Sequence, residues 1–148
     1  MPELVVLMGI QGSGKSTFCR ERFYDSHVRI NLDMLRTRHR ERVLFETTLK
    51  LGLSCVIDNT NPARSDRTRY LAAAKQADYT ITGYFFEAKI DACLARNARR
   101  TGKARIPDAG VRATRNRLEA PSFEEGFGTL YFVRIDENDR FLVEDWKQ

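Results

Sequence analysis

Residues 9–16 read Gly-Ile-Gln-Gly-Ser-Gly-Lys-Ser and directly follow an apolar run, Leu4–Met8. The stretch matches the phosphate-loop pattern G-x-x-x-x-G-K-[ST] at every specified position, and it has the strand-like run before it and the helix-like spacing after it that the pattern requires. Its glycines allow the backbone to curl so tightly that consecutive N–H groups point toward one anion. The sequence therefore predicts a strand, a phosphate-binding loop and a helix in succession.

This loop predicts that the protein binds ATP together with Mg²⁺. The lysine reaches the β- and γ-phosphates, the serine hydroxyl meets the metal, and the helix that follows directs the positive end of its dipole at the same charge. A glycine-rich turn that binds no nucleotide is the alternative. We assign nucleotide binding to Gly9, Gly12, Ser13, Gly14, Lys15, Ser16 and Thr17, with Ser16 also a metal ligand.

The length and composition indicate one phosphate-handling domain. The chain has 148 residues, enough for a single domain over residues 1–148, and its net charge is +5. Of its 25 basic residues, 19 are arginine, whose planar guanidinium grips two phosphate oxygens at once. Genomic codon bias would explain the arginine excess equally well. Composition alone therefore only favours a polyanionic partner.

The sequence also predicts where the protein works. No charged segment followed by a long apolar stretch opens the chain, and no run has the length of a membrane-spanning helix. We expect a soluble, cytoplasmic protein with no membrane partner. The three cysteines are odd in number and widely spaced, which fits neither a disulfide framework nor a zinc site, so we expect small buried side chains at Cys19, Cys55 and Cys93.

Apolar runs alternate with segments of helical spacing along the whole chain. This alternation predicts an α/β fold in which a mainly parallel sheet of about five strands is flanked by helices. We expect strands at Leu4–Met8, Val28–Leu32, Ser54–Ile57, Thr80–Phe86 and Leu130–Ile135. We expect helices at Lys15–Tyr24, Asp33–Leu51, Pro62–Gln76, Ala88–Arg100 and Pro107–Leu118. Turn-forming residues at 136–139 predict a C-terminal hairpin over about residues 129–146.

Acidic residues follow the second and third predicted strands, at the sheet edge where ligands bind in open α/β sheets. Asp58 closes the third strand, as does the acid that orients Mg²⁺ in phosphate-loop enzymes. Asp33 opens the next helix, whose i, i+3, i+7 stripe carries Arg36 and Arg40, so its carboxylate should stay ionised and could accept a hydroxyl proton. The alternative for Asp33 is a helix N-cap and nothing more.

The remaining arginines of this region suggest two kinds of surface. We expect Arg38 and Arg42 to lie on a solvated charged face together with Glu41. The later group at Arg96, Arg99 and Arg100 precedes a basic, glycine-containing loop, which predicts a mobile lid at about residues 100–107 that brings an arginine over the γ-phosphate. A basic surface without catalytic work is the alternative.

In this order and spacing the motifs resemble the kinase domain of the polynucleotide kinases, including the phage enzymes and the bifunctional kinase–phosphatases. The resemblance covers the chain from Val5 to about Phe132. It is carried by Gly9–Thr17, by Asn31-Leu32-Asp33 with Arg36, by residues 57–62 (Ile-Asp-Asn-Thr-Asn-Pro), by Arg96–Arg100 with Ile106-Pro107, and by residues 119–127 (Glu-Ala-Pro-Ser-Phe-Glu-Glu-Gly-Phe).

The resemblance implies a P-loop kinase that transfers the ATP γ-phosphate to a 5′-hydroxyl of DNA or RNA. Asp33 would be the general base, Arg36 an acceptor-phosphate contact, and Arg96 and Arg100 the lid arginines. The family often has arginine where this chain has Leu32. The segment at 136–139 lacks the D-x-D-G-T phosphatase signature, so no phosphatase activity is expected. Around the base we expect the acceptor to contact Arg36, Arg40, Thr60, Asn61 and Arg64, with Arg67 widening the same basic groove.

Two other functions stay open on the sequence. The same loop, base and lid would serve a kinase of another hydroxyl, on a modified base in DNA, a nucleoside or a small metabolite. A nucleotide-binding switch or partner-regulated ATPase is the second, although a switch needs no hydroxyl base such as Asp33. No protein partner is implied.

Overall fold

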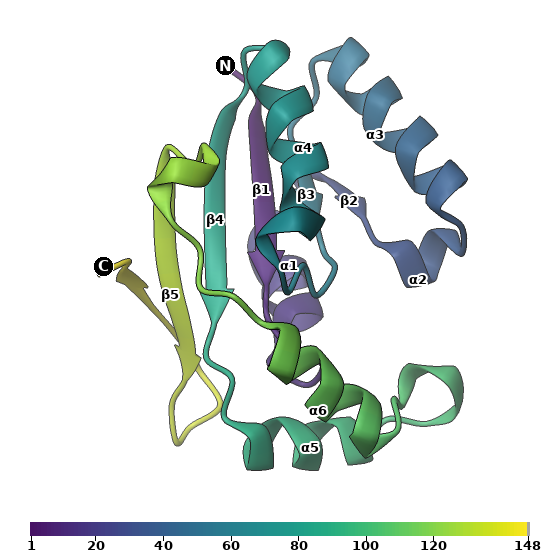
Figure 1. Cartoon of the computed structure of the whole chain (residues 1–148), viewed down its shortest axis with the longest axis vertical. Helices are drawn as coiled ribbons and strands as arrows, with labels where there is room; N and C mark the ends of the chain where they lie inside the picture. Colours follow the sequence, from purple (N-terminus) through teal and green to yellow (C-terminus); the bar gives the residue numbers. More distant parts are fainter. Residues whose placement is uncertain (148) are drawn as a thin grey trace.

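Six strands form one sheet in the order β2-β3-β1-β4-β5-β6 in the computed structural model, which describes residues 1–147 (Figure 1). The first five strands along the chain run parallel to their neighbours, and only β6 is antiparallel, to β5. The predicted α/β class is therefore confirmed. The strands are β1 (Glu3–Met8), β2 (Val28–Ile30), β3 (Cys55–Ile57), β4 (Thr80–Phe86), β5 (Thr129–Ile135) and β6 (Phe141–Asp145).

Helices connect the parallel strands, and residues 1–147 also include two short 3₁₀ turns. The predicted turn at residues 136–139 joins β5 and β6 into a hairpin. The helices are α1 (Lys15–Phe23), α2 (Leu32–Leu35), α3 (Arg38–Leu51), α4 (Arg64–Gln76), α5 (Ile90–Ala98) and α6 (Asp108–Arg117), with 3₁₀ turns η1 (Gly102–Ala104) and η2 (Phe123–Glu125). Within residues 1–147 none of these helices is both long and apolar enough to cross a lipid bilayer.

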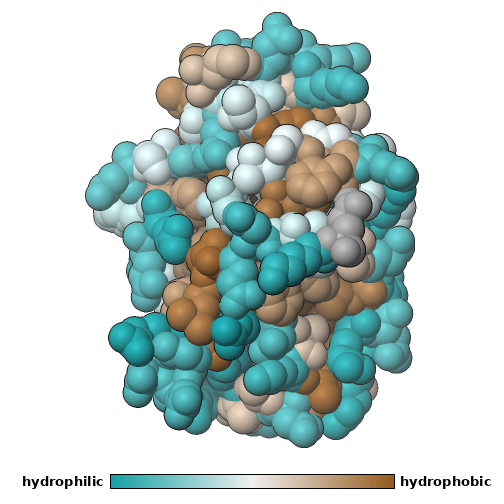
Figure 2. All heavy atoms as spheres, turned by 90° about the vertical axis from the view of Figure 1, so that its left-hand side faces the viewer, coloured by the Kyte–Doolittle hydropathy of each residue, from teal (hydrophilic) through white to brown (hydrophobic). Residues whose placement is uncertain are grey.

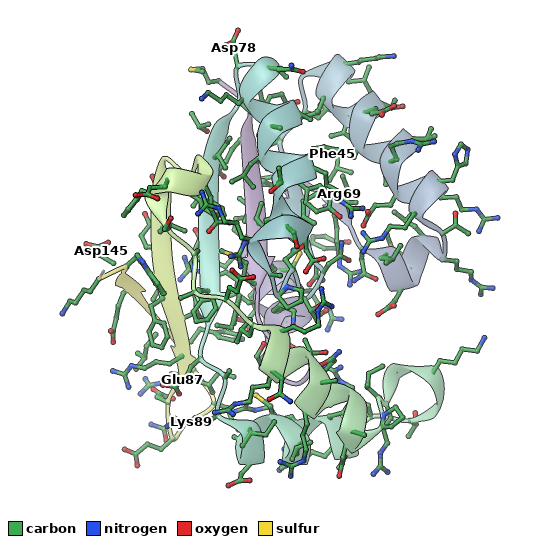
Figure 3. All side chains as sticks on the ribbon, in the orientation of Figure 1. Phe45, Arg69, Asp78, Glu87, Lys89 and Asp145 are labelled. Atoms are coloured by element: carbon green, nitrogen blue, oxygen red, sulfur yellow. The ribbon has the colours of Figure 1, made fainter. Side chains whose placement is uncertain are left out.

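The apolar strand β1 is buried because helices cover both faces of the sheet around it. Leu4, Val6 and Met8 face the core shared with α3 and α4. Phe45 of α3 (labelled in Figure 3) packs edge-on against Tyr70 there. The alternate residues of β1 face α1 on the other side, with Phe18 at the centre of an aromatic cluster. The three cysteines are buried and free, as predicted.

The face that carries the hairpin is only partly covered. Figure 2 shows this side of the molecule, where apolar side chains lie among hydrophilic ones. Trp146, just after β6, packs against Phe85 and Phe132, with ring centroids 5.4 and 6.4 Å away. The hairpin thus continues the aromatic packing of the sheet toward its last edge.

The single helix predicted over Asp33–Leu51 is wrong, because the chain breaks between α2 and α3. Arg36 adopts φ 77°, in the left-handed region, and closes α2 by donating its backbone N–H to the Leu32 carbonyl. Thr37 then starts α3 as its N-cap, since its Oγ1 accepts a hydrogen bond from the Arg40 backbone N–H at 3.1 Å. The predicted i, i+3, i+7 stripe of one helix therefore does not exist.

At one end of the sheet α5 and α6 lie across the carboxyl ends of the parallel strands (Figure 1). They pack around the phosphate loop through a small core of Ile10, Cys93 and Val111. Glu87 and Lys89 mark the exit of the chain from β4 toward α5 (Figure 3). The phosphate loop thus lies between the sheet and this helical pair.

Candidate active site

A polar cleft of about 270 Å³ opens beyond the carboxyl ends of β1, β2 and β3. Its walls come from the phosphate loop, from α2, from the segment between β3 and α4, and from the segment around η1. Segments far apart in the chain therefore converge on one site. Of the residues predicted to act, seven line it: Lys15, Ser16, Asp33, Asp58, Thr60, Asn61 and Arg100.

The phosphate loop has the backbone that its glycines predict. Gly12 and Gly14 have φ 78° and 99°, which favours residues without a Cβ atom. A Cβ atom on Gly12 would also lie 2.2 Å from the Cys93 carbonyl oxygen, so α5 leaves no room for a side chain there. The Gly9 N–H donates to the Thr60 carbonyl at 3.0 Å, which ties the loop to the segment after β3.

The Lys15 ammonium is buried beside the phosphate loop, where a bound phosphate would supply the opposite charge. Its Nζ donates to the Ile10 carbonyl at 2.8 Å and contacts Ser13 Oγ at 3.4 Å. Burial lowers the pKa of Lys15 to about 8; the Asp58 and Asp33 carboxylates oppose this shift and Arg100 adds to it. Because an anionic ligand would favour the charged form, a phosphate placed against Nζ would raise this pKa again.

Ser16 and Asp58 form the oxygen pair expected of a magnesium site. Ser16 Oγ donates to Asp58 Oδ2 at 3.0 Å, and the same oxygen accepts from Arg29 Nε at 2.8 Å. Among residues 1–147 no group of three His, Cys, Asp or Glu side chains could hold a metal by itself. A hydroxyl and one carboxylate nevertheless fit Mg²⁺, which usually keeps several waters and binds through one or two carboxylates plus substrate phosphates.

Asp33 lies on the cleft wall and is not a helix cap. The cap of α2 is Asn31, whose Oδ1 accepts the Met34 backbone N–H at 2.8 Å, while its Nδ2 donates to the Asp58 carbonyl. Asn59 Oδ1 in turn accepts the Leu32 backbone N–H at 2.8 Å. Two asparagines thus bind the short helix α2 to the end of β3 and hold it with the Asp33 side chain exposed on the cleft wall.

The three arginines at the end of α5 have different surroundings. Arg100 lines the cleft, whereas Arg96 donates from Nη1 to the Gly12 carbonyl at 3.0 Å and so contacts the phosphate loop from outside the cleft. Arg99 is exposed at the C-cap of α5. Buried Asn97 exchanges two hydrogen bonds with the backbone of Ile106, which closes the segment between them into a loop.

Three predicted acceptor contacts and one groove arginine lie elsewhere. Arg36, Arg40 and Arg64 are exposed and do not line the cleft. Arg67 cannot widen a basic groove, because it is fully buried: Nε pairs with Glu125 at 2.9 Å and Nη1 donates to the Asn61 and Glu119 carbonyls. This arginine therefore fixes the segment after β3 from behind the cleft.

Sequence reasoning missed residues on both sides of the cleft. Arg38 lines it, and Glu41, expected on a solvated face, is only 2% exposed. The helical spacing that suggested a solvated face assumed one continuous helix; with the break at Arg36, α3 buries Glu41 and places the exposed Arg38 on the cleft wall. Arg117 and Gln11 also line the cleft. No motif in the sequence marks Arg117, and Gln11 stands at an unspecified position of the phosphate-loop pattern.

Comparison with known proteins agrees with this geometry. A bifunctional polynucleotide phosphatase/kinase of Schizosaccharomyces pombe is 29% identical over 129 residues, covering 84% of this chain but only 32% of that relative. Among solved structures, Chaetomium thermophilum Kti12 in complex with ADP-AlF3 is similar with a TM-score of 0.66 at 16% identity, covering 92% of each chain. A gluconokinase from Sinorhizobium meliloti has a TM-score of 0.59 at 20% identity, covering 90% of this chain and 82% of its own.

These likenesses show a fold shared with P-loop kinases. The chain spans about a third of the length of the curated relative that it matches. A family model described as an AAA domain matches residues 4–121, which include the phosphate loop, the three carboxylates that line the cleft (Asp33, Asp58 and Asp66) and residues 100–107. The chain therefore belongs to this AAA domain family and carries its phosphate loop in a P-loop kinase fold.

Proposed function

We propose that this protein is an ATP-dependent kinase that phosphorylates the 5′-hydroxyl end of DNA or RNA. The observation that carries the proposal is one cleft containing a phosphate loop lysine, an accessible carboxylate and a lid arginine: Lys15, Asp33 and Arg100. Phosphoryl transfer needs these three elements, because it depends on positioning and on neutralising charge more than on covalent chemistry. A switch protein would need the loop but not the carboxylate.

Each side chain has a role that follows from its surroundings. Asp33 accepts the proton of the attacking hydroxyl, since its carboxylate is exposed in the cleft and its neighbours hold the helix that carries it. Lys15 and the loop N–H groups hold the β- and γ-phosphates. Arg100 stabilises the charge that develops during transfer, as lid arginines do in phosphoryl transfer.

Mg²⁺ fits beside Ser16 and Asp58. The metal would neutralise the charge on the phosphate oxygens and so lower the barrier to transfer. Arg29 shares Asp58 Oδ2, so it keeps that carboxylate oriented toward Ser16.

Two observations support the choice of acceptor: the charge of the cleft wall and the similarity to a known relative. Arg38 in α3, Arg100 just after α5 and Arg117 in α6 line the cleft, where Arg117 pairs with Asp66. These arginines suit a polyanion better than a neutral sugar. The similarity to a bifunctional polynucleotide phosphatase/kinase supports the same acceptor. A kinase of a modified base, a nucleoside or a small metabolite is the second candidate, because the donor half of the cleft would be unchanged.

One labelling experiment separates these functions. The protein is incubated with γ-labelled ATP and Mg²⁺ and with 5′-hydroxyl DNA and RNA oligonucleotides, nucleosides or sugars in parallel. We expect the best kcat/KM with an oligonucleotide, and an acceptor affinity that falls with salt at a log–log slope of about −0.7 for each phosphate contact to a single strand. A neutral acceptor with better kcat/KM and no salt dependence would favour the second candidate. ATP turnover without any acceptor would favour a switch.

A further inference from the structure

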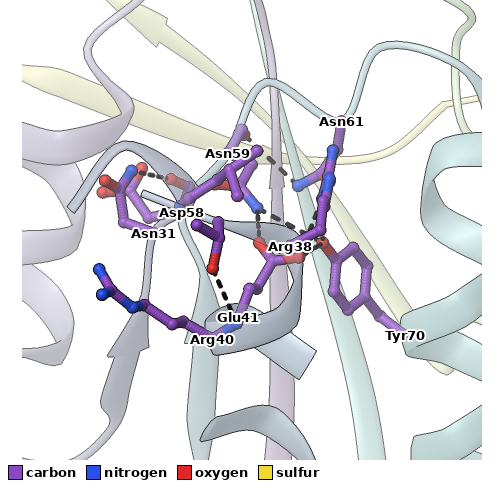
Figure 4. Close-up of polar contacts among 10 residues, drawn as sticks. Asn31, Arg38, Arg40, Glu41, Asp58, Asn59, Asn61 and Tyr70 are labelled. Carbon is purple, nitrogen blue, oxygen red and sulfur yellow. Dashed lines mark hydrogen bonds and ion pairs between the residues drawn. The ribbon is translucent and has the colours of Figure 1, made fainter. Parts of the chain in front are cut away.

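A buried carboxylate joins three polar side chains behind the cleft (Figure 4). Glu41 Oε1 accepts hydrogen bonds from Arg38 Nη1 at 2.9 Å and from the Tyr70 hydroxyl at 2.8 Å. Its other oxygen accepts from Asn59 Nδ2 at 2.8 Å. Burial raises the pKa of Tyr70 to about 12, with the bond to Glu41 adding to the shift, so the phenol donates at neutral pH. Both carboxylate oxygens of Glu41 thus accept hydrogen bonds.

Arg38 is held by this cluster at one nitrogen only. Both of its hydrogen bonds within residues 1–147, to Glu41 and to Tyr70, use Nη1. The N–H groups of Nε and Nη2 make no hydrogen bond within the described residues. The side chain lies on the cleft wall and is 53% exposed. A guanidinium that is anchored at one nitrogen on a cleft wall can offer its other two nitrogens to two oxygens of an anion such as a phosphate.

The same carboxylate also supports the predicted base. Asn59 donates to Glu41 through Nδ2 and accepts the Leu32 backbone N–H through Oδ1. Leu32 opens α2, and Asp33 is the next residue. Glu41 thus fixes, through one intermediate side chain, the helix that carries Asp33, and fixes Arg38 directly.

We propose that Arg38 binds a phosphate of the acceptor strand, and that Glu41 is the positioning residue that sets Arg38 and the Asp33 helix relative to each other. The inference rests on the proposed function and deepens it. A 5′-terminal nucleotide carries its hydroxyl and its first phosphodiester on the same sugar. A cleft that holds both a base and a free guanidinium can therefore bind both groups of one nucleotide.

The test of the Arg38 contact removes the charge from each partner in turn. Kinetics are measured with a 5′-hydroxyl oligonucleotide and with the same strand carrying an uncharged methylphosphonate at its first linkage. Arg38→Ala should raise the KM for the normal acceptor by roughly 10–100-fold, the range for a lost hydrogen bond to a charged group, and leave the KM for ATP unchanged. The methylphosphonate should then cost the variant little, although it costs the wild type as much as the mutation does.

Arg42→Ala is the matched control, because Arg42 is an exposed arginine on the same helix that does not line the cleft. It should keep the wild-type KM and the wild-type penalty for the methylphosphonate. An equal penalty in Arg38→Ala and in the wild type would overturn the contact while leaving the kinase standing. A wild-type protein that labels no 5′-hydroxyl oligonucleotide would instead overturn the proposed function, and the inference with it.

Glu41 and Tyr70 test the positioning role. Glu41→Gln removes one acceptor oxygen and sets an NH₂ group against a donor, so it should raise the acceptor KM and also lower kcat, with ATP affinity within about twofold of wild type. Tyr70→Phe keeps the ring that packs on Phe45 and should raise only the acceptor KM. If Glu41→Gln does not fold, Tyr70→Phe alone tests the positioning role. Unchanged acceptor KM in folded Tyr70→Phe and Glu41→Gln proteins would overturn the role.

Discussion

Ser16 Oγ donates a 3.0 Å hydrogen bond to Asp58 Oδ2, which joins the first turn of α1 to the end of β3 across 42 residues of sequence. The two segments are brought together because β1 and β3 are parallel neighbours whose carboxyl ends meet at one edge of the sheet. The serine gives its hydroxyl hydrogen to the carboxylate, and its oxygen lone pairs remain for a ligand. Sheet topology, rather than local sequence, therefore assembles the donor half of the cleft.

Asp33→Asn should lower the transfer rate by roughly 10²–10⁴ and leave ATP affinity nearly intact, because the amide keeps the shape of the side chain but cannot take a proton. Thermal unfolding should hardly change, since Asn31 caps α2. Asn31→Ala is the contrasting variant and should cost about 1 kcal/mol of stability. Wild-type turnover in Asp33→Asn would remove the base assignment.

Lys15 should make the stability of the nucleotide-free protein depend on alkaline pH. Its pKa is about 8 in the native state against 10.5 ordinarily, so between these values the unfolded chain binds a proton that the native state lacks. The free energy of unfolding should rise with pH through this window, and below about pH 8 the native state carries the full cost of the buried charge.

Lys15→Met should abolish turnover but stabilise the nucleotide-free protein at neutral pH, by about 3 kcal/mol for a shift of this size. It should also lose the rise in stability between about pH 8 and pH 10. Urea unfolding of both proteins across this range measures the difference. Parallel pH profiles would mean that Lys15 titrates normally.

Arg100→Ala should lower kcat more than it weakens ATP binding, because charge stabilisation is needed most during transfer. Arg96→Ala should instead raise the KM for ATP, since Arg96 contacts the Gly12 carbonyl of the phosphate loop. Arg99→Ala, at an exposed C-cap, is the control. Steady-state kinetics distinguish these patterns, and small equal effects at all three positions would indicate a basic surface only.

Glu125→Gln should destabilise the protein by roughly 3–5 kcal/mol, because it leaves the buried Arg67 guanidinium without its charge partner. Arg117→Ala breaks an ion pair with Asp66 at a similar N–O distance, 3.0 Å, but the arginine is 61% exposed, so stability should change by less than about 1 kcal/mol. Chemical denaturation measures both. Similar losses in the two variants would show that burial does not govern these pairs.

The sequence predicted the sheet, the phosphate loop and the acids that follow β2 and β3, because each rests on a short-range pattern. Alternating apolar runs fix the strands, and the glycines fix the loop. The break between α2 and α3 was missed because it depends on a left-handed backbone conformation at Arg36. Arginine has no preference for this conformation, so the sequence gives no sign of the break. Burial of Arg67 and Glu41 was missed for a related reason: their partners, Glu125, Asn59 and Tyr70, meet them only in the tertiary structure.

The hydrogen bonds between Asn97 and Ile106 limit which residues of the predicted lid could move. Helix α5 is anchored, because Cys93 packs against Gly12 and Arg96 bonds to the same residue. If the predicted lid moves with these contacts intact, its hinge lies within residues 98–105, a short flap that Asn97 and Ile106 tether at its base. Arg100 belongs to this flap, and a Cβ atom on Gly102, which has φ 60°, would meet no other atom within 4 Å. Movement of this flap would therefore displace Arg100 from the cleft while Arg96 stays on the phosphate loop, so the two arginines would not move together.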